Sequence, residues 1–144
     1  MIVLDTNILV AGLWSRTGAS FALITNALDG RLDFAISVAL AFEYEAVLKR
    51  DVMREASWAD DKMLETLLDG LFAQAKLVMP IRTKLRPTLR DPDDEMILEC
   101  AVQSGAESIV TMNVRDFVPA KKQYGIEIET PSECLVRLFY GEKS

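Results

Sequence analysis

The chain has 144 residues, half of them hydrophobic, which predicts a single globular domain over residues 1–144. With 22 acidic and 16 basic residues, its net charge of −6 argues against nonspecific binding of polyanions, though not against a nucleic-acid enzyme whose own site is acidic. The chain contains no histidine, which excludes Ser-His and Cys-His triads and histidine metal sites. A catalytic metal would therefore need oxygen ligands, which select Mg²⁺ or Mn²⁺ over Zn²⁺.

Strands and helices are predicted to alternate along the chain. Short apolar runs predict strands at 2–5, 32–36, 77–79, 108–111 and 126–128. Apolar residues at helical spacing, with capping residues at the ends, predict helices over 19–29, 37–50, 60–76 and 91–104, and from the capping box at Thr130 onward. This alternation is typical of an α/β fold in which helices cover a parallel sheet.

The first predicted strand ends directly in Asp5, which Thr6 and Asn7 follow. A buried strand that ends in a carboxylate places it at the carboxyl edge of the sheet, where ligands and metals bind in open α/β folds. The same three residues are common turn formers. The motif alone therefore favours a capping role and a functional role about equally.

A second acid, Glu43, lies on the predicted helix 37–50. Its spacing places it on a stripe with Leu40 and Val47, and a carboxylate on a buried face needs a cation or a polar partner. Glu45 lies nearer the outer face. Tyr44 and Leu48 also fit an apolar stripe, which leaves the choice between the two acids open.

A third acidic motif, R-D-P-D-D-E at 90–95, opens the next predicted helix. Asp91 followed by proline is a good helix start, and acids in the first turn interact favourably with the helix dipole. Asp94 differs, because it shares a face with Ile97 and Leu98, the face that is expected to pack on the sheet.

The segment 111–117, T-M-N-V-R-D-F, follows a predicted strand and is expected at the same sheet edge as Asp5. By itself it is equally compatible with an ordinary turn. Acids that converge at one edge repel one another unless a divalent cation neutralises them. Such a centre suits phosphodiester hydrolysis, because the metal polarises a phosphate oxygen and lowers the pKa of water.

In order and spacing these motifs resemble the PIN-domain family of metal-dependent ribonucleases, which includes the VapC-like toxins of toxin–antitoxin pairs. The resemblance rests on V-L-D-T-N-I-L-V at 3–10, on the segment from Ser37 through Glu43, on R-D-P-D-D at 90–94, and on 109–117. It implies a Rossmann-like, three-layer α/β/α sandwich with a central parallel sheet of about five strands.

The resemblance also implies the site residues. Four acids would be catalytic and would hold Mg²⁺ or Mn²⁺, namely Asp5, Glu43, Asp94 and Asp116. Many members have Asp where this chain has Asn113, and others have Asn there with an Asp three residues on, as in this chain. The resemblance therefore implies Asp116 as the fourth acid and Asn113 as a candidate polar support. Its presence keeps open a noncatalytic module with a decayed metal site. Three residues look like the family's hydrogen bonders that orient the carboxylates, Thr6, Asn7 and Thr111.

Basic residues cluster before the acidic helix start. They suggest contacts to RNA phosphates, although an ordinary solvated loop explains any one of them at least as well. The candidates in this cluster are Arg82, Lys84, Arg86 and Arg90, and Arg115 is a further candidate near the same sheet edge. The resemblance further implies an antitoxin partner and a homodimer or higher homo-oligomer.

The leading interpretation is a metal-dependent endoribonuclease acting as the toxin of a type II toxin–antitoxin pair. A housekeeping RNA-processing nuclease and a noncatalytic PIN-like binding module are the alternatives. A phosphatase of the haloacid-dehalogenase type also begins with a strand-end Asp, but it requires a second Asp where this chain has Asn7.

Cys100 and Cys134 lack metal-site spacing and fall in apolar helical segments, so we expect buried free thiols in a reducing, cytoplasmic compartment. The N-terminal apolar run is too short for a signal peptide, and no segment reaches membrane-spanning length.

Overall fold

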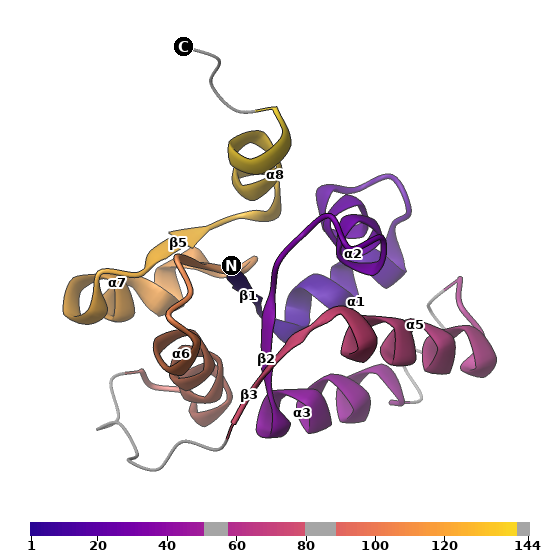
Figure 1. Cartoon of the computed structure of the whole chain (residues 1–144), viewed down its shortest axis with the longest axis horizontal. Helices are drawn as coiled ribbons and strands as arrows, with labels where there is room; N and C mark the ends of the chain where they lie inside the picture. The colour runs from indigo at the N-terminus through magenta and orange to yellow at the C-terminus, as the bar shows by residue number, and fades with distance from the viewer. Residues whose placement is uncertain (51–57, 80–88, 141–144) are drawn as a thin grey trace.

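The computed structural model describes residues 1–50, 58–79 and 89–140. Strands and helices alternate along the chain (Figure 1). In chain order the elements are β1 (Ile2–Leu4), α1 (Thr6–Trp14), α2 (Ala19–Leu28), β2 (Ala35–Ser37), α3 (Val38–Leu48), α5 (Asp61–Gln74), β3 (Lys76–Val78), α6 (Pro92–Ser104), β4 (Ser108–Val110), the 3-10 helix η1 (Val114–Phe117), α7 (Val118–Tyr124), β5 (Glu127–Glu129) and α8 (Pro131–Phe139).

Short parallel strands form the sheet within the described residues, in the order β3-β2-β1-β4-β5. The group β1-β4-β5 and the pair β2-β3 meet at one bridge between Ile2 and Phe34. There the Ile2 N–H also donates to the Asp33 carbonyl at 3.0 Å. The predicted parallel sheet is confirmed, and its two parts are joined by this bridge rather than by a longer ladder.

Helices lie on both sides of the strands, with α6 and α7 on one side and α1, α3 and α5 on the other (Figure 1). Strands covered on both faces are expected to be apolar throughout. Accordingly every residue of β1 is fully buried, and so are Ile109 and Val110 in β4. The architecture is the predicted three-layer α/β/α sandwich.

Most helix ends follow from local capping. The N-caps of α3, α5 and α6 are Ser37, Asp60 and Asp91, and each side chain accepts a backbone N–H of the first turn. Thr130 and Glu133 form the reciprocal capping box expected at the start of α8. Helix α6 ends at Gly105, whose φ of +69° lies in the left-handed region that favours glycine.

Three elements differ from the sequence prediction. Helix α1 occupies residues for which no helix was predicted, and Asp5 is its N-cap. This helix is apolar along most of its length because it packs against α2 and α3, so it lacks the alternation of polar and apolar residues that marks a surface helix. The short elements η1 and α7 follow β4, where no regular structure was predicted.

Cys100 and Cys134 are both free and buried, as predicted. Among the described residues no single helix is long and apolar enough to cross a membrane, while α1 and α2 meet the length and composition criteria only as a pair bent by 108°.

Candidate metal centre

Asp5 lies at the carboxyl end of β1, beside β4, where the strand order changes direction. Ligands bind at such switch points in open α/β sheets. The side chain is buried; its Oδ2 accepts from the Thr111 hydroxyl at 2.7 Å and its Oδ1 from the Asn7 N–H at 3.3 Å. Burial raises the pKa of Asp5 and repulsion from Asp116 adds to this, so the pKa stays raised although the hydrogen bonds lower it.

The polar residues around Asp5 tie β1 to the segment after β4. Thr111, which donates to Asp5, also accepts the Asn113 backbone N–H at 3.0 Å. The Asn7 side-chain oxygen accepts the Met112 N–H at 3.3 Å. Thr111 therefore orients the Asp5 carboxylate, and Asn7 holds the 111–113 segment in place.

Thr6 behaves differently from the other polar residues near Asp5. Its hydroxyl oxygen is buried and has no hydrogen-bond partner within the described part of the chain. A buried hydroxyl without a partner is unfavourable, and it marks a position where a ligand or an ordered water could be bound.

A cleft of about 690 Å³ lies between the start of α6 and the η1–α7 segment. Its lining combines three carboxylates and two guanidinium groups with Leu89 and Pro119; the charged residues are Arg90, Asp91, Asp94, Arg115 and Asp116. The cleft therefore contains Asp94 and Asp116, two of the four acids selected from the sequence.

Of these acids, Asp94 has the most strongly raised pKa. Burial raises its pKa, and repulsion from Asp5, Asp91, Asp116 and Asp93 raises it further, to about 6. Carboxylates affect one another in this way only when they lie near each other. Asp5 and Asp116 therefore share the electrostatic environment of Asp94.

Glu43 reaches the same environment from α3. Burial raises its pKa, repulsion from Asp93, Asp91 and Asp5 raises it further, and Arg50 opposes these effects. The side chain is half-buried, at the edge of the buried face of α3.

Glu45, the alternative acid on the same helix, serves a different purpose. It forms an ion pair with Lys49, one helical turn away, at 3.6 Å. The buried face of α3 includes both Tyr44 and Leu48, the two residues that left the sequence assignment open.

The four acids are thus linked electrostatically, but they are not a preassembled cage. Within 1–50, 58–79 and 89–140, no three acidic or thiol side chains are grouped closely enough to hold one ion as they stand. Their chemistry nevertheless fits a hard divalent cation, because every donor is an oxygen and a cation would relieve the repulsion that raises their pKa values. The unpartnered Thr6 hydroxyl beside Asp5 agrees with this fit.

Two acids that the sequence analysis assigned mainly to the helix start also belong to this environment. Asp91 accepts the Asp93 N–H at 2.9 Å, as expected of an N-cap, and it also lines the cleft. Asp91 and Asp93 both repel Glu43 and Asp94. The run of acids at 91–95 was the available signal, but helix capping accounted for Asp91 and, in part, for Asp93.

Of the predicted RNA-contact residues, Arg90 and Arg115 line the cleft. Neither forms an ion pair with a carboxylate in the described residues, so both guanidinium groups can donate to a phosphate. Arg82, Lys84 and Arg86 lie outside the described residues.

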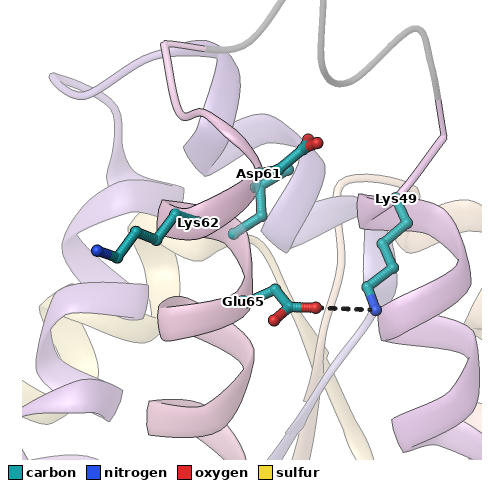
Figure 2. Close-up of a pocket in the computed structure, with 5 residues that line it drawn as sticks. Lys49, Asp61, Lys62 and Glu65 are labelled. Atoms are coloured by element: carbon teal, nitrogen blue, oxygen red, sulfur yellow. Dashed lines mark ion pairs between the residues drawn. The ribbon is translucent and has the colours of Figure 1, made fainter.

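A separate pocket of about 360 Å³ lies between the end of α3 and the start of α5. Figure 2 shows Lys49 and Glu65 facing each other across it, while Lys62 points away. The Lys49 Nζ and Glu65 Oε1 atoms are 3.3 Å apart and form an ion pair. Lys49 is paired with Glu45 and with Glu65, so Glu65 in this pocket is neutralised, unlike the mutually repelling acids around Asp94. We do not place the functional site there.

A family model for the PIN domain matches residues 1–115. The chain belongs to the PIN domain family. PIN domains are typically metal-dependent nucleases, so this one is expected to use divalent metal ions in phosphodiester hydrolysis. The matched region contains Asp5, Glu43 and Asp94 and ends one residue before Asp116. No curated protein matches this PIN domain.

Proposed function

We propose that this PIN domain is a Mg²⁺- or Mn²⁺-dependent endoribonuclease and the toxin of a type II toxin–antitoxin pair. The observation that carries the nuclease proposal is the convergence of acids from β1, α3, α6 and η1 at one edge of the sheet, where burial and mutual repulsion raise the pKa values of Asp5, Glu43 and Asp94. Crowding of this kind is costly unless a cation is bound.

In this proposal the cation is held by Asp5, Glu43, Asp94 and Asp116. When bound, it would stabilise charge on the scissile phosphate and make a water molecule more acidic. Thr111 fixes the orientation of the Asp5 carboxylate through its 2.7 Å hydrogen bond. The open cleft beside these acids gives a phosphate access to them.

Arg90 and Arg115 bind the substrate in this mechanism. They lie on the same cleft as Asp94 and Asp116, so a phosphate in the cleft can accept hydrogen bonds from guanidinium groups while it faces the acids. Local cations of this kind allow a protein of net charge −6 to bind RNA. The bound chain is single-stranded RNA, whose backbone can enter a cleft of this size.

The toxin assignment rests on the resemblance of the motifs to VapC-like proteins, and it implies an antitoxin partner, a homodimer or higher homo-oligomer, and a cytoplasmic location. Growth arrest on induced expression, relieved by co-expression of an antitoxin, would support it. Active enzyme without growth arrest would favour the housekeeping RNA-processing nuclease.

The nuclease proposal is tested by cleavage of single-stranded RNA in Mg²⁺ or Mn²⁺, with and without EDTA. Glu43→Gln and Glu45→Gln form a matched pair, because the same neutral substitution is made two residues apart on α3. We expect Glu43→Gln to lower kcat/KM by about a hundredfold or more and Glu45→Gln to leave it near the wild-type value. Cleavage that persists in EDTA, or equal effects of the two substitutions, would contradict the proposal.

A further inference from the structure

A second cavity, at the carboxyl edge of the sheet, has no role in the proposed metal chemistry. Its volume is about 500 Å³, and it lies between α1, α2 and the start of α8. We call it the Ser20 pocket; its lining residues are Ala11, Ser15, Gly18, Ala19, Ser20, Met112, Thr130, Pro131 and Ser132.

One chain segment lines both the Ser20 pocket and the 690 Å³ cleft beside Asp94 and Asp116, which we call the acidic cleft. Met112 lines the Ser20 pocket, while Arg115 and Asp116, three and four residues later, line the cleft. This segment is fixed beside the acids, because Asn7 accepts the Met112 N–H and Thr111 donates to Asp5. An RNA chain that crosses this shared segment can therefore occupy both cavities at once.

The chemistry of the lining determines which part of an RNA chain the pocket suits. Among the lining residues that the structure describes, none has a charged side chain, so this part of the pocket lacks the cations that a phosphate group would require. Apolar groups of Ala11, Met112 and Pro131 are combined with serine and threonine hydroxyls. Apolar surface with a few hydrogen-bonding groups is typical of sites for uncharged, flat ligands, and a nucleobase is such a ligand.

Ser20 gives the pocket a group that can recognise such a ligand. The residue is 5% exposed, and its hydroxyl donates to the Met112 sulfur at 3.9 Å. A thioether sulfur is a weak acceptor, so this buried hydroxyl is poorly satisfied. A carbonyl oxygen or ring nitrogen of a base would be a stronger acceptor at the same place.

We propose that the Ser20 pocket binds the base of a nucleotide next to the phosphate that lies in the acidic cleft, with the Ser20 hydroxyl donating to that base. The inference rests on the proposed ribonuclease function and adds to it a source of sequence preference. The RNA chain crosses the shared segment at Met112. Its backbone then lies against the acids, while one base points toward α2 and α8.

The test measures the binding of short single-stranded RNAs in Ca²⁺ buffer by fluorescence anisotropy, with one abasic position moved along the strand. For the wild-type protein we expect one position at which loss of the base weakens binding about tenfold, the usual size of a base contact. Ala19→Leu places extra volume in the pocket, and Ser20→Ala removes the donor. Both should remove the difference between intact and abasic RNA at that position.

Ala46→Leu on the exposed side of α3 is the matched control and should keep that difference. The inference is overturned if no abasic position matters, if wild-type protein binds no RNA, or if both pocket variants discriminate as well as wild type while remaining folded. Position-specific binding without cleavage would remove the nuclease proposal and leave the base pocket. Cleavage without a base-sensitive position would overturn the base pocket and leave the nuclease proposal.

Discussion

At the scale of single residues, Asp94 shows most clearly what crowding of acids does to the metal-free protein. Its pKa is about 6 in the folded state, against 3.8 for an unperturbed aspartate, chiefly because of burial and then because of repulsion from Asp5. The folded protein therefore holds this proton more tightly than the unfolded chain does. The corresponding stability is fully present below about pH 4 and is lost as the pH rises through about 6.

Neutralising Asp94 should consequently stabilise the metal-free protein near neutral pH. We expect Asp94→Asn to raise the free energy of unfolding in EDTA by about 1 kcal/mol at pH 7.5, after allowance for solvent screening, and to give no gain at pH 4. Thermal unfolding at the two pH values measures this. Asp69→Asn, at an exposed position of α5, is the control and should show no such dependence on pH. A loss of stability of similar size at both pH values would show that Asp94 has a structural rather than an electrostatic role.

At the scale of elements, one buried contact joins the two elements that carry Asp5 and Glu43. Tyr44 in α3 is fully buried, and its hydroxyl donates to the backbone carbonyl of Leu4 at the end of β1. Leu4 directly precedes Asp5, and Glu43 directly precedes Tyr44. This hydrogen bond therefore sets how α3 lies against the strand end, and with it the separation of the two acids.

Removal of the Tyr44 hydroxyl should affect metal binding more than a general loss of stability would. We expect Tyr44→Phe to lower the free energy of unfolding by about 1 kcal/mol and to weaken Mn²⁺ binding about tenfold in calorimetry. Leu48→Val, in the same buried face of α3, should cost about as much stability and leave Mn²⁺ affinity unchanged. If both variants bind Mn²⁺ equally well, Tyr44 only stabilises the fold.

The elements also show which features local sequence signals could predict. Capping residues such as Asp91 and Thr130 determine helix ends through contacts within one turn, so the starts of α6 and α8 were predicted closely. Helix α1 was missed because its surroundings are apolar on most sides, and burial of that kind removes the periodic pattern. The single bridge between Ile2 and Phe34 depends on tertiary packing and has no local signal.

The same distinction holds for the candidate site. Asp5 and Asp94 could be selected from the sequence because each follows directly from a local pattern, a strand end and a buried helix face. Tyr44 could not, since an apolar stripe gives no indication that a hydroxyl will meet a particular carbonyl. The Ser20 pocket was not predicted either, because it is formed by α1, α2, the segment after β4 and α8, which are distant in sequence.

At the scale of the whole molecule, the sheet brings the functional features to one edge. The strand order β3-β2-β1-β4-β5 places the ends of β1 and β4 side by side, so Asp5 and Thr111 meet although they are far apart in the chain. The acidic cleft and the Ser20 pocket share the segment that follows β4. In the proposed function this edge would offer a phosphate site and a base site to one RNA chain.

The proposed nuclease activity depends on a divalent ion that draws together acids from four separate elements. A crystal soaked with Mn²⁺ and measured for anomalous scattering tests this directly. We predict one principal peak at this edge of the sheet, coordinated by oxygens of Asp5 and Asp94 and by at least one of Glu43 and Asp116, and lost in Asp5→Asn. A principal peak elsewhere, or no peak at these acids at millimolar Mn²⁺, would contradict metal binding by these acids.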